Sequence, residues 1–138
     1  MANRFFPPLE GVSTPGTCII HFKFFPNGTS TSALVVAPAL ASTSTANAYI
    51  ASVIRTATAG QFTITLVDKY VSYLYGNAQI HLNTPATDLN VNLSGVDVVT
   101  NKTVLVNVVA AGAATDITGG ANNYITVQLV LCNSGLVA

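Results

Sequence analysis

Two histidines and five dispersed acidic residues are the side chains with which this chain could carry out acid–base or metal chemistry. His21 and His81 each fall inside a strand-like segment, and neither has a second metal ligand at short spacing. Asp68, His81 and a serine are the residue types of a catalytic triad, but the sequence lacks the Gly-x-Ser-x-Gly motif that presents a nucleophilic serine. It also has no phosphate-binding glycine loop and no Cys-x-x-Cys pair. We therefore predict that the protein is not an enzyme and holds no metal or cofactor.

Cys18 and Cys132 lie in apolar, strand-like segments near opposite ends of the chain. One interpretation is two buried thiols that behave as small hydrophobic side chains. The other is a disulfide, which requires the first and last strands to be neighbours. Two cysteines are too few for a disulfide framework, and the N-terminal segment lacks the unbroken apolar run of a secretion signal. The sequence therefore favours thiols.

Three tyrosines, Tyr70, Tyr73 and Tyr75, stand close together in the sequence and form an aromatic concentration with Phe62. In a sugar-binding module, such rings would stack on the faces of pyranose rings. The alternative is a cluster in the core or in a subunit contact, because tyrosine commonly buries its ring and leaves its hydroxyl in water. We favour the core or contact cluster.

The sparse charge of the chain restricts the kinds of partner it can have. Only 7% of the residues are charged and the formal net charge is zero, whereas an ordinary soluble domain has about 25% charged residues. The five basic residues are scattered, so the clustered cations that bind nucleic acid or an anionic membrane surface are missing. No apolar run approaches the roughly 18 residues of a membrane helix. Thr, Ser, Asn, Ala and Val replace the charges, which favours a subunit packed against other subunits.

Apolar and polar residues alternate with a period of two along most of the chain, which is typical of half-buried strands. In one such segment, Phe62, Ile64 and Leu66 make the apolar face. Turn signals such as Asn27-Gly28 separate the segments and favour antiparallel hairpins. The clearest alternating segments are 18–24, 61–66, 102–108 and 124–131.

These segments predict an all-β fold, an antiparallel, jelly-roll-like β-sandwich that forms a single domain over residues 17–138. The run from Asp68 to Gly76 is an exception, because its apolar residues recur at helical spacing. We predict one helical turn there, crossing between the two sheets.

Residues 1–16 show little alternation and hold three of the six prolines, so they are predicted to form an extended N-terminal arm. Its two phenylalanines are bulky rings on a segment with no core of its own, and the following prolines stiffen it for docking. We predict that the arm docks onto a neighbouring subunit; the alternative is that it folds back over its own sandwich. The candidate partner-binding residues are Arg4, Phe5, Phe6, Pro7 and Pro8.

Three segments of the chain resemble small all-β virion proteins of tailed bacteriophages that decorate or cement the capsid. They are the start Arg4-Phe5-Phe6-Pro7, the central run GQFTITLVDKY at 60–70, and the closing run VQLVLCNS at 127–134. The central run is similar to a Gly-x-(Tyr/Phe)-Thr-Val-Thr-Leu-x-Asp-Lys-Tyr pattern in such proteins. The resemblance implies a β-sandwich, often a homotrimer, without enzymatic activity.

The resemblance and the sparse charge together predict a structural virion protein on the outer capsid surface. Its expected partners are the major capsid protein, bound across subunit boundaries, and further copies of this chain. The alternative is a head-fibre or tail module that binds a host receptor or glycan, motivated by the three tyrosines. No nucleic-acid or membrane partner is expected.

Overall fold

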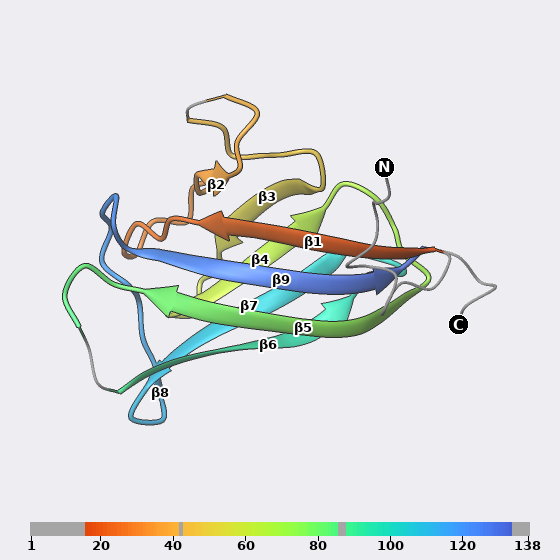
Figure 1. The fold of residues 1–138 in the computed structure, drawn as a ribbon. Coiled ribbons are helices and arrows are strands. Elements are labelled where there is room, and N and C mark those ends of the chain that lie inside the picture. Colours follow the sequence, from red (N-terminus) through yellow and green to blue (C-terminus); the bar gives the residue numbers. More distant parts are fainter. Residues whose placement is uncertain (1–15, 42, 86–87, 134–138) are drawn as a thin grey trace, which may run out of the picture.

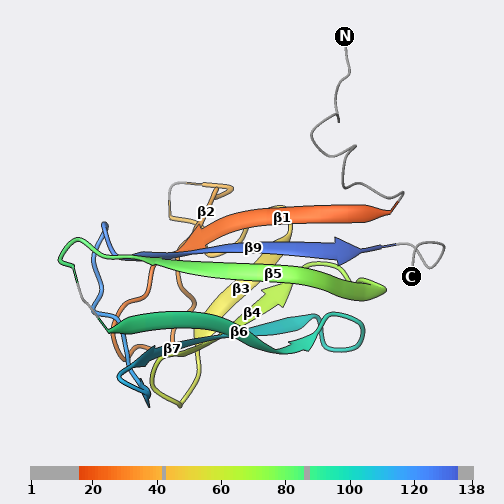
Figure 2. The same ribbon diagram turned by 60° about the horizontal axis from the view of Figure 1, so that its bottom comes forward.

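A computed structural model describes residues 16–41, 43–85 and 88–133 of the chain. These residues form two antiparallel sheets packed face to face, so the predicted all-β sandwich is confirmed (Figures 1 and 2). The strands are β1 (Thr17–Phe24), β2 (Val36–Ala37), β3 (Ile50–Arg55), β4 (Gln61–Leu66), β5 (Ser72–His81), β6 (Leu89–Asp97), β7 (Thr103–Ala110), β8 (Ala113–Ala114) and β9 (Tyr124–Cys132).

The two sheets divide the strands into two layers. The first sheet has the order β2-β1-β9-β5 and lies in front in Figure 1. The second has the order β3-β4-β7-β6, with β8 paired to β7, and lies behind it. In Figure 2, β1, β9 and β5 form the upper layer and β6 and β7 lie below them. The first and last long strands, β1 and β9, are neighbours along their whole length.

The core lies between the layers and is made by the apolar faces that the alternation predicts. On β4, Phe62, Ile64 and Leu66 are fully buried, while the residues between them point outward. The Phe62 ring packs against the Phe24 ring of β1 across the sandwich, with 5.2 Å between ring centroids. The alternation works as a predictor because each long strand has one face toward the core and one toward the exterior.

The predicted helical turn at 68–76 is wrong, because the chain is extended strand from Ser72 onward. The cause is a β-bulge between Tyr73 and Tyr75, where the pairing of β5 with β9 shifts register. The extra residue leaves both Leu74 and Tyr75 exposed, which breaks the period of two. An apolar pattern broken in this way imitates helical spacing, although the backbone stays paired in the sheet.

Gly60 makes the tight connection from β3 to β4 and brings a third segment of chain against it. Its backbone φ is 64°, in the left-handed region that favours glycine. A Cβ at this position would lie 2.5 Å from the carbonyl oxygens of both Thr115 and Val108. The close approach therefore requires glycine, and it carries the segment before β9 across this end of the second sheet.

Candidate functional site

The predicted partner-binding residues of the N-terminal arm lie outside the described residues. Arg4, Phe5, Phe6, Pro7 and Pro8 therefore remain a prediction from the sequence. The arm's attachment point is described: the backbone N–H of Asn133 donates a hydrogen bond to the Gly16 carbonyl, at 2.6 Å.

Among the outward-pointing residues on the outer face of the second sheet, the one charged side chain is that of Asp97 at the end of β6, which pairs with Thr103 at the margin of the face. The outward-pointing residues of β3, β4 and β7, and those of β6 from Asn90 to Ser94, are uncharged. We call this surface the neutral face. Leu105 lies near its middle, paired with Thr63 on one side and Ser94 on the other. The residues of the neutral face are Ser52, Ile54, Gln61, Thr63, Thr65, Asn90, Asn92, Ser94, Thr103, Leu105, Asn107 and Val109.

Hydrogen bonds between side chains order part of the neutral face. The Gln61 side-chain amide donates to Asn107 Oδ1 at 3.1 Å, and the Asn107 amide donates to Ser94 Oγ at 2.5 Å. This ladder runs across three neighbouring strands, from β4 through β7 to β6. Side chains held in this way lose less rotamer freedom when a partner covers them. The neutral face is therefore a partly preorganised surface for hydrogen-bonded contact.

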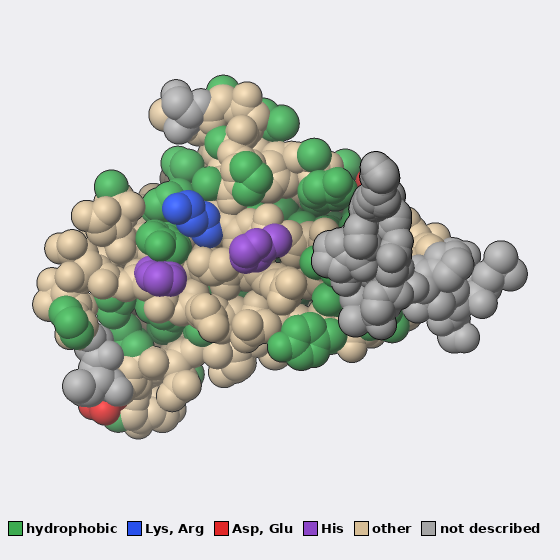
Figure 3. All heavy atoms as spheres, viewed as in Figure 1, with side chains coloured by type: hydrophobic (Ala, Val, Ile, Leu, Met, Phe, Trp, Pro, Cys, Tyr) green, Lys and Arg blue, Asp and Glu red, His purple; other side chains and the backbone are tan. Residues whose placement is uncertain are grey.

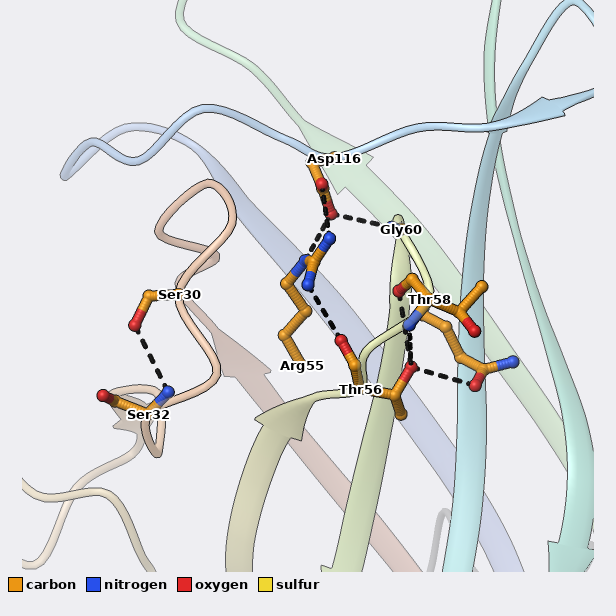
Figure 4. Close-up of polar contacts among 8 residues, drawn as sticks. Ser30, Ser32, Arg55, Thr56, Thr58, Gly60 and Asp116 are labelled. Carbon is orange, nitrogen blue, oxygen red and sulfur yellow. Dashed lines mark hydrogen bonds and ion pairs between the residues drawn. The ribbon is translucent and has the colours of Figure 1, made fainter.

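An ion pair between Arg55, at the end of β3, and Asp116, in the segment before β9, lies at the end of the sandwich beside the neutral face (Figure 4). Arg55 Nε and Nη2 donate to the two carboxylate oxygens of Asp116, at 2.6 and 2.7 Å. The Gly60 N–H also donates to Asp116, at 2.7 Å. The hydrogen bonds from Arg55, and then that from Gly60, hold the pKa of Asp116 below its usual value. The arrangement ties the connection between β3 and β4 to the segment before β9.

Replacing Asp116 by asparagine should lower the melting temperature at about pH 7, and the difference from the native protein should shrink in acid. The pKa of Asp116 is lowered in the folded state, whereas an unfolded aspartate has a pKa of about 3.9. The ionised carboxylate therefore stabilises the fold above that pH, and the contribution is lost as the pH falls through the lowered value. Thermal unfolding followed by circular dichroism between about pH 7 and about pH 2 measures this difference.

The matched control is Asp88→Asn, at the exposed last residue of the β5–β6 connection. It should have little effect on the melting temperature at any pH. A difference between Asp116→Asn and the native protein that stays constant with pH would contradict the role given to the Asp116 charge.

The outer face of the first sheet gathers basic and aromatic side chains, and we call it the cationic face after the charge of Lys23. Tyr124 of β9 stands between Lys23 of β1 and His81 of β5, because β1 and β5 flank β9. The His81 and Tyr124 rings stack with 4.6 Å between centroids, and Lys23 Nζ lies 4.3 Å from the Tyr124 centroid. Phe25 packs nearby, 5.5 Å from Lys23 Nζ. Figure 3 views this face and shows the histidines and a basic side chain on it, with acidic side chains only at its margins.

A hollow of about 470 Å³ lies on the cationic face beside Lys23. His21, Lys23, Tyr124 and Thr126 line it from the sheet, and Ala37 and Pro38 form its wall. The alternation in the sequence places Ile19, His21 and Lys23 on one face of a strand. It does not indicate that Tyr124 and His81 lie on the same face of the folded sheet. The missing information is the strand order, because His81 and Tyr124 meet only through the pairing of β5 with β9.

The two histidines share the cationic face but lie too far apart to hold one metal ion. His21 pairs with Gln128 and His81 pairs with Tyr124, on opposite sides of β9. Two strand spacings of about 4.8 Å and four residues of about 3.4 Å separate them by roughly 17 Å. Among the described residues, no group of three His, Cys, Asp or Glu side chains could hold a metal.

The cysteines lie on adjacent strands, but the register keeps their side chains apart. Cys18 is opposite Leu131 and Cys132 is opposite Thr17, so the two side chains point to opposite faces of the sheet. Both cysteines are thiols, as the sequence favoured. Burial, with a hydrogen bond to Cys18, raises the pKa of Tyr70 to about 12.

The three tyrosines do not form one aromatic surface. Tyr70 is buried and belongs to the core together with Phe62, whereas Tyr73 is half-buried at its edge. Tyr75 is 55% exposed on the cationic-face side of β5. The core interpretation therefore holds for Phe62 and Tyr70, and the three tyrosines do not share a surface on which a sugar could stack.

No family model, curated protein or solved structure matches this chain. The fold and the two faces therefore define it as a small all-β protein of two antiparallel sheets. In the part of the chain that the structure describes, no helix has the length and apolar character of a membrane span.

Proposed function

We propose that this protein is a structural virion subunit that decorates or cements a bacteriophage capsid by binding across major capsid protein subunits. The proposal rests on the resemblance of the segments at 4–7, 60–70 and 127–134 and on the two-sheet sandwich. In this role, the sandwich is a rigid body placed over a seam of the shell. Repetition around a symmetric shell strengthens weak single contacts through avidity.

The observation that carries the proposal is the neutral face. A sheet surface of Thr, Ser, Asn and Gln whose one charged side chain, Asp97, lies at the margin suits contact with another protein surface, because docking over its middle strips no ion of water. It does not suit a polyanion, which is bound through clustered cations. The ladder through Gln61, Asn107 and Ser94 supports this use, since it holds donors and acceptors in place before contact.

Removing residues 1–16 should leave a folded sandwich that no longer binds shells. The described core is built from strands β1 to β9, which begin at Thr17, so the truncated chain retains all its strands. Phe5 and Phe6, followed by the stiffening Pro7 and Pro8, would be the part of the chain that lies across a seam. Co-sedimentation with shells stripped of this chain measures binding, and circular dichroism measures folding.

Phe5→Ala combined with Phe6→Ala in the full-length chain is the matched variant, because it removes the rings and leaves the backbone. It should reproduce the loss of binding seen on truncation. Binding at native strength by a folded truncated chain would refute the docking role of the arm.

A second candidate function is a head-fibre or tail module that binds a host receptor or glycan. The three tyrosines that first suggested it do not share a surface. The hollow on the cationic face, with Lys23 and His21 beside an apolar wall, is the observation that favours it. The two functions use opposite faces of the sandwich, so one chain has the surfaces for both.

A further inference from the structure

We infer that the hollow on the cationic face binds a carboxylate-bearing saccharide. The inference does not rest on capsid binding, because the hollow lies on the opposite face of the sandwich from the neutral face. Its volume of about 470 Å³ falls within the range of small-ligand sites. The ligand class follows from the charge, the walls and the backbone around it.

The charge of the site is carried by Lys23. The side chain is half-buried, and its ammonium lies over the rings of Tyr124 and Phe25. The ion pair found among the described residues joins Arg55 to Asp116 and does not involve Lys23. No acidic residue lines the hollow. The Lys23 ammonium therefore lacks a carboxylate partner in the described part of the chain, and a ligand carboxylate would supply one.

The position of Lys23 is fixed by its aromatic neighbours. Tyr124 is held between Lys23 on one side and His81 on the other. A lysine in a cation–π contact is restricted before a ligand arrives, which reduces the ordering cost of binding. With His81 stacked on its ring and the Lys23 ammonium 4.3 Å from its centroid, Tyr124 serves as a rigid support for the cation rather than as a platform for a sugar ring.

The walls of the hollow favour a saccharide as the body of the ligand. Ala37 and Pro38 offer apolar surface to the C–H groups of a sugar ring. Thr126 and His21 line the same hollow and can exchange hydrogen bonds with sugar hydroxyls.

The backbone around Lys23 disfavours a phosphate, which is usually held by several convergent donors. Lys23 is paired on one side with Ala37 of β2 and on the other with Thr126 of β9. The backbone N–H groups around Lys23 therefore make hydrogen bonds within the sheet and do not converge on a bound anion. A single ammonium beside an apolar wall matches a singly charged carboxylate better.

The test is a titration of the full-length, ¹⁵N-labelled protein followed by amide chemical shifts. Glucuronic acid and glucose are the matched probes, because they differ only in the carboxylate, and inorganic phosphate is the third. Glucuronate should shift the amides of Lys23, Ala37, Tyr124 and Thr126 and bind at least about tenfold more tightly than glucose or phosphate, a factor equal to one well-made contact. Phosphate binding as tightly as glucuronate would reduce the site to a general anion site and overturn the inference.

Two variants make the result specific to the hollow. Lys23→Met keeps the length of the side chain and removes the charge, and it should weaken glucuronate binding at least about tenfold. Lys69→Met, at an exposed position between β4 and β5, should bind as the native chain does. Equal binding of glucose and glucuronate, unchanged binding by Lys23→Met, or no shift around the hollow would each overturn the inference. None of these outcomes depends on capsid binding, which is measured separately.

Discussion

Replacing Phe62 by alanine should lower the free energy of unfolding by about 3–5 kcal/mol, the usual cost of removing a buried aromatic side chain. Phe62 has no exposed surface, and its ring packs on Phe24 of the opposite sheet. The change removes the contact between β4 and β1 and leaves a cavity between the layers. Equilibrium unfolding in urea measures the difference, with the slope against denaturant checked for a two-state transition.

The neighbouring residues of β4 provide the controls for this prediction. Ile64→Ala, which also removes a fully buried side chain, should cost about 2–5 kcal/mol. Thr63→Ala lies between them on the neutral face and should cost much less in the isolated chain. Small and equal effects at all three positions would contradict the assignment of the core to one face of this strand.

Replacing Leu105 by lysine should weaken binding to stripped shells by about 100-fold or more. Leu105 lies near the middle of the neutral face, half-buried between Thr63 and Ser94. A charge placed there and covered by a partner loses water without gaining an opposite charge, and such a loss costs about 3–5 kcal/mol. Each 1.4 kcal/mol or so corresponds to a factor of ten in affinity, which sets the size of the expected effect.

Gln79→Lys is the matched control, because it adds the same charge at an exposed position on the outer face of the first sheet. It should bind stripped shells as the native chain does, while Leu105→Lys should remain folded by circular dichroism. If Leu105→Lys bound at native strength, or if both variants lost binding equally, the neutral face would not be the surface that docks.

The alternation of apolar and polar residues was sufficient to predict the sandwich, because burial on one side of a strand leaves a period of two in the sequence. Phe62, Ile64 and Leu66 are an example, since all three are fully buried. The same reasoning failed at 68–76, where a β-bulge shifts the side chains after Tyr73 and the apolar residues follow a different spacing. A bulge depends on pairing with a distant strand, which local spacing does not reveal.

The candidate sites were less accessible from the sequence, because both depend on the strand order. The sequence shows that charge is sparse, but only the order β3-β4-β7-β6 shows that the middle of one face is uncharged, with Asp97 at its margin. In the same way, His81 and Tyr124 are distant in the sequence and meet through pairing in the sheet. His21 and Lys23 were visible on one face of a predicted strand, but their aromatic neighbours were not.

The central claim is that this chain is a structural subunit of a virion, and the copy number of the chain in purified particles tests it most directly. Quantitative mass spectrometry of virus particles purified from the source of the gene would give its ratio to the major capsid protein. The proposal predicts hundreds of copies per particle, in a fixed ratio to the shell subunits. A few copies would instead assign the chain to a head fibre or tail, and complete absence from the particles would contradict a structural role in the virion.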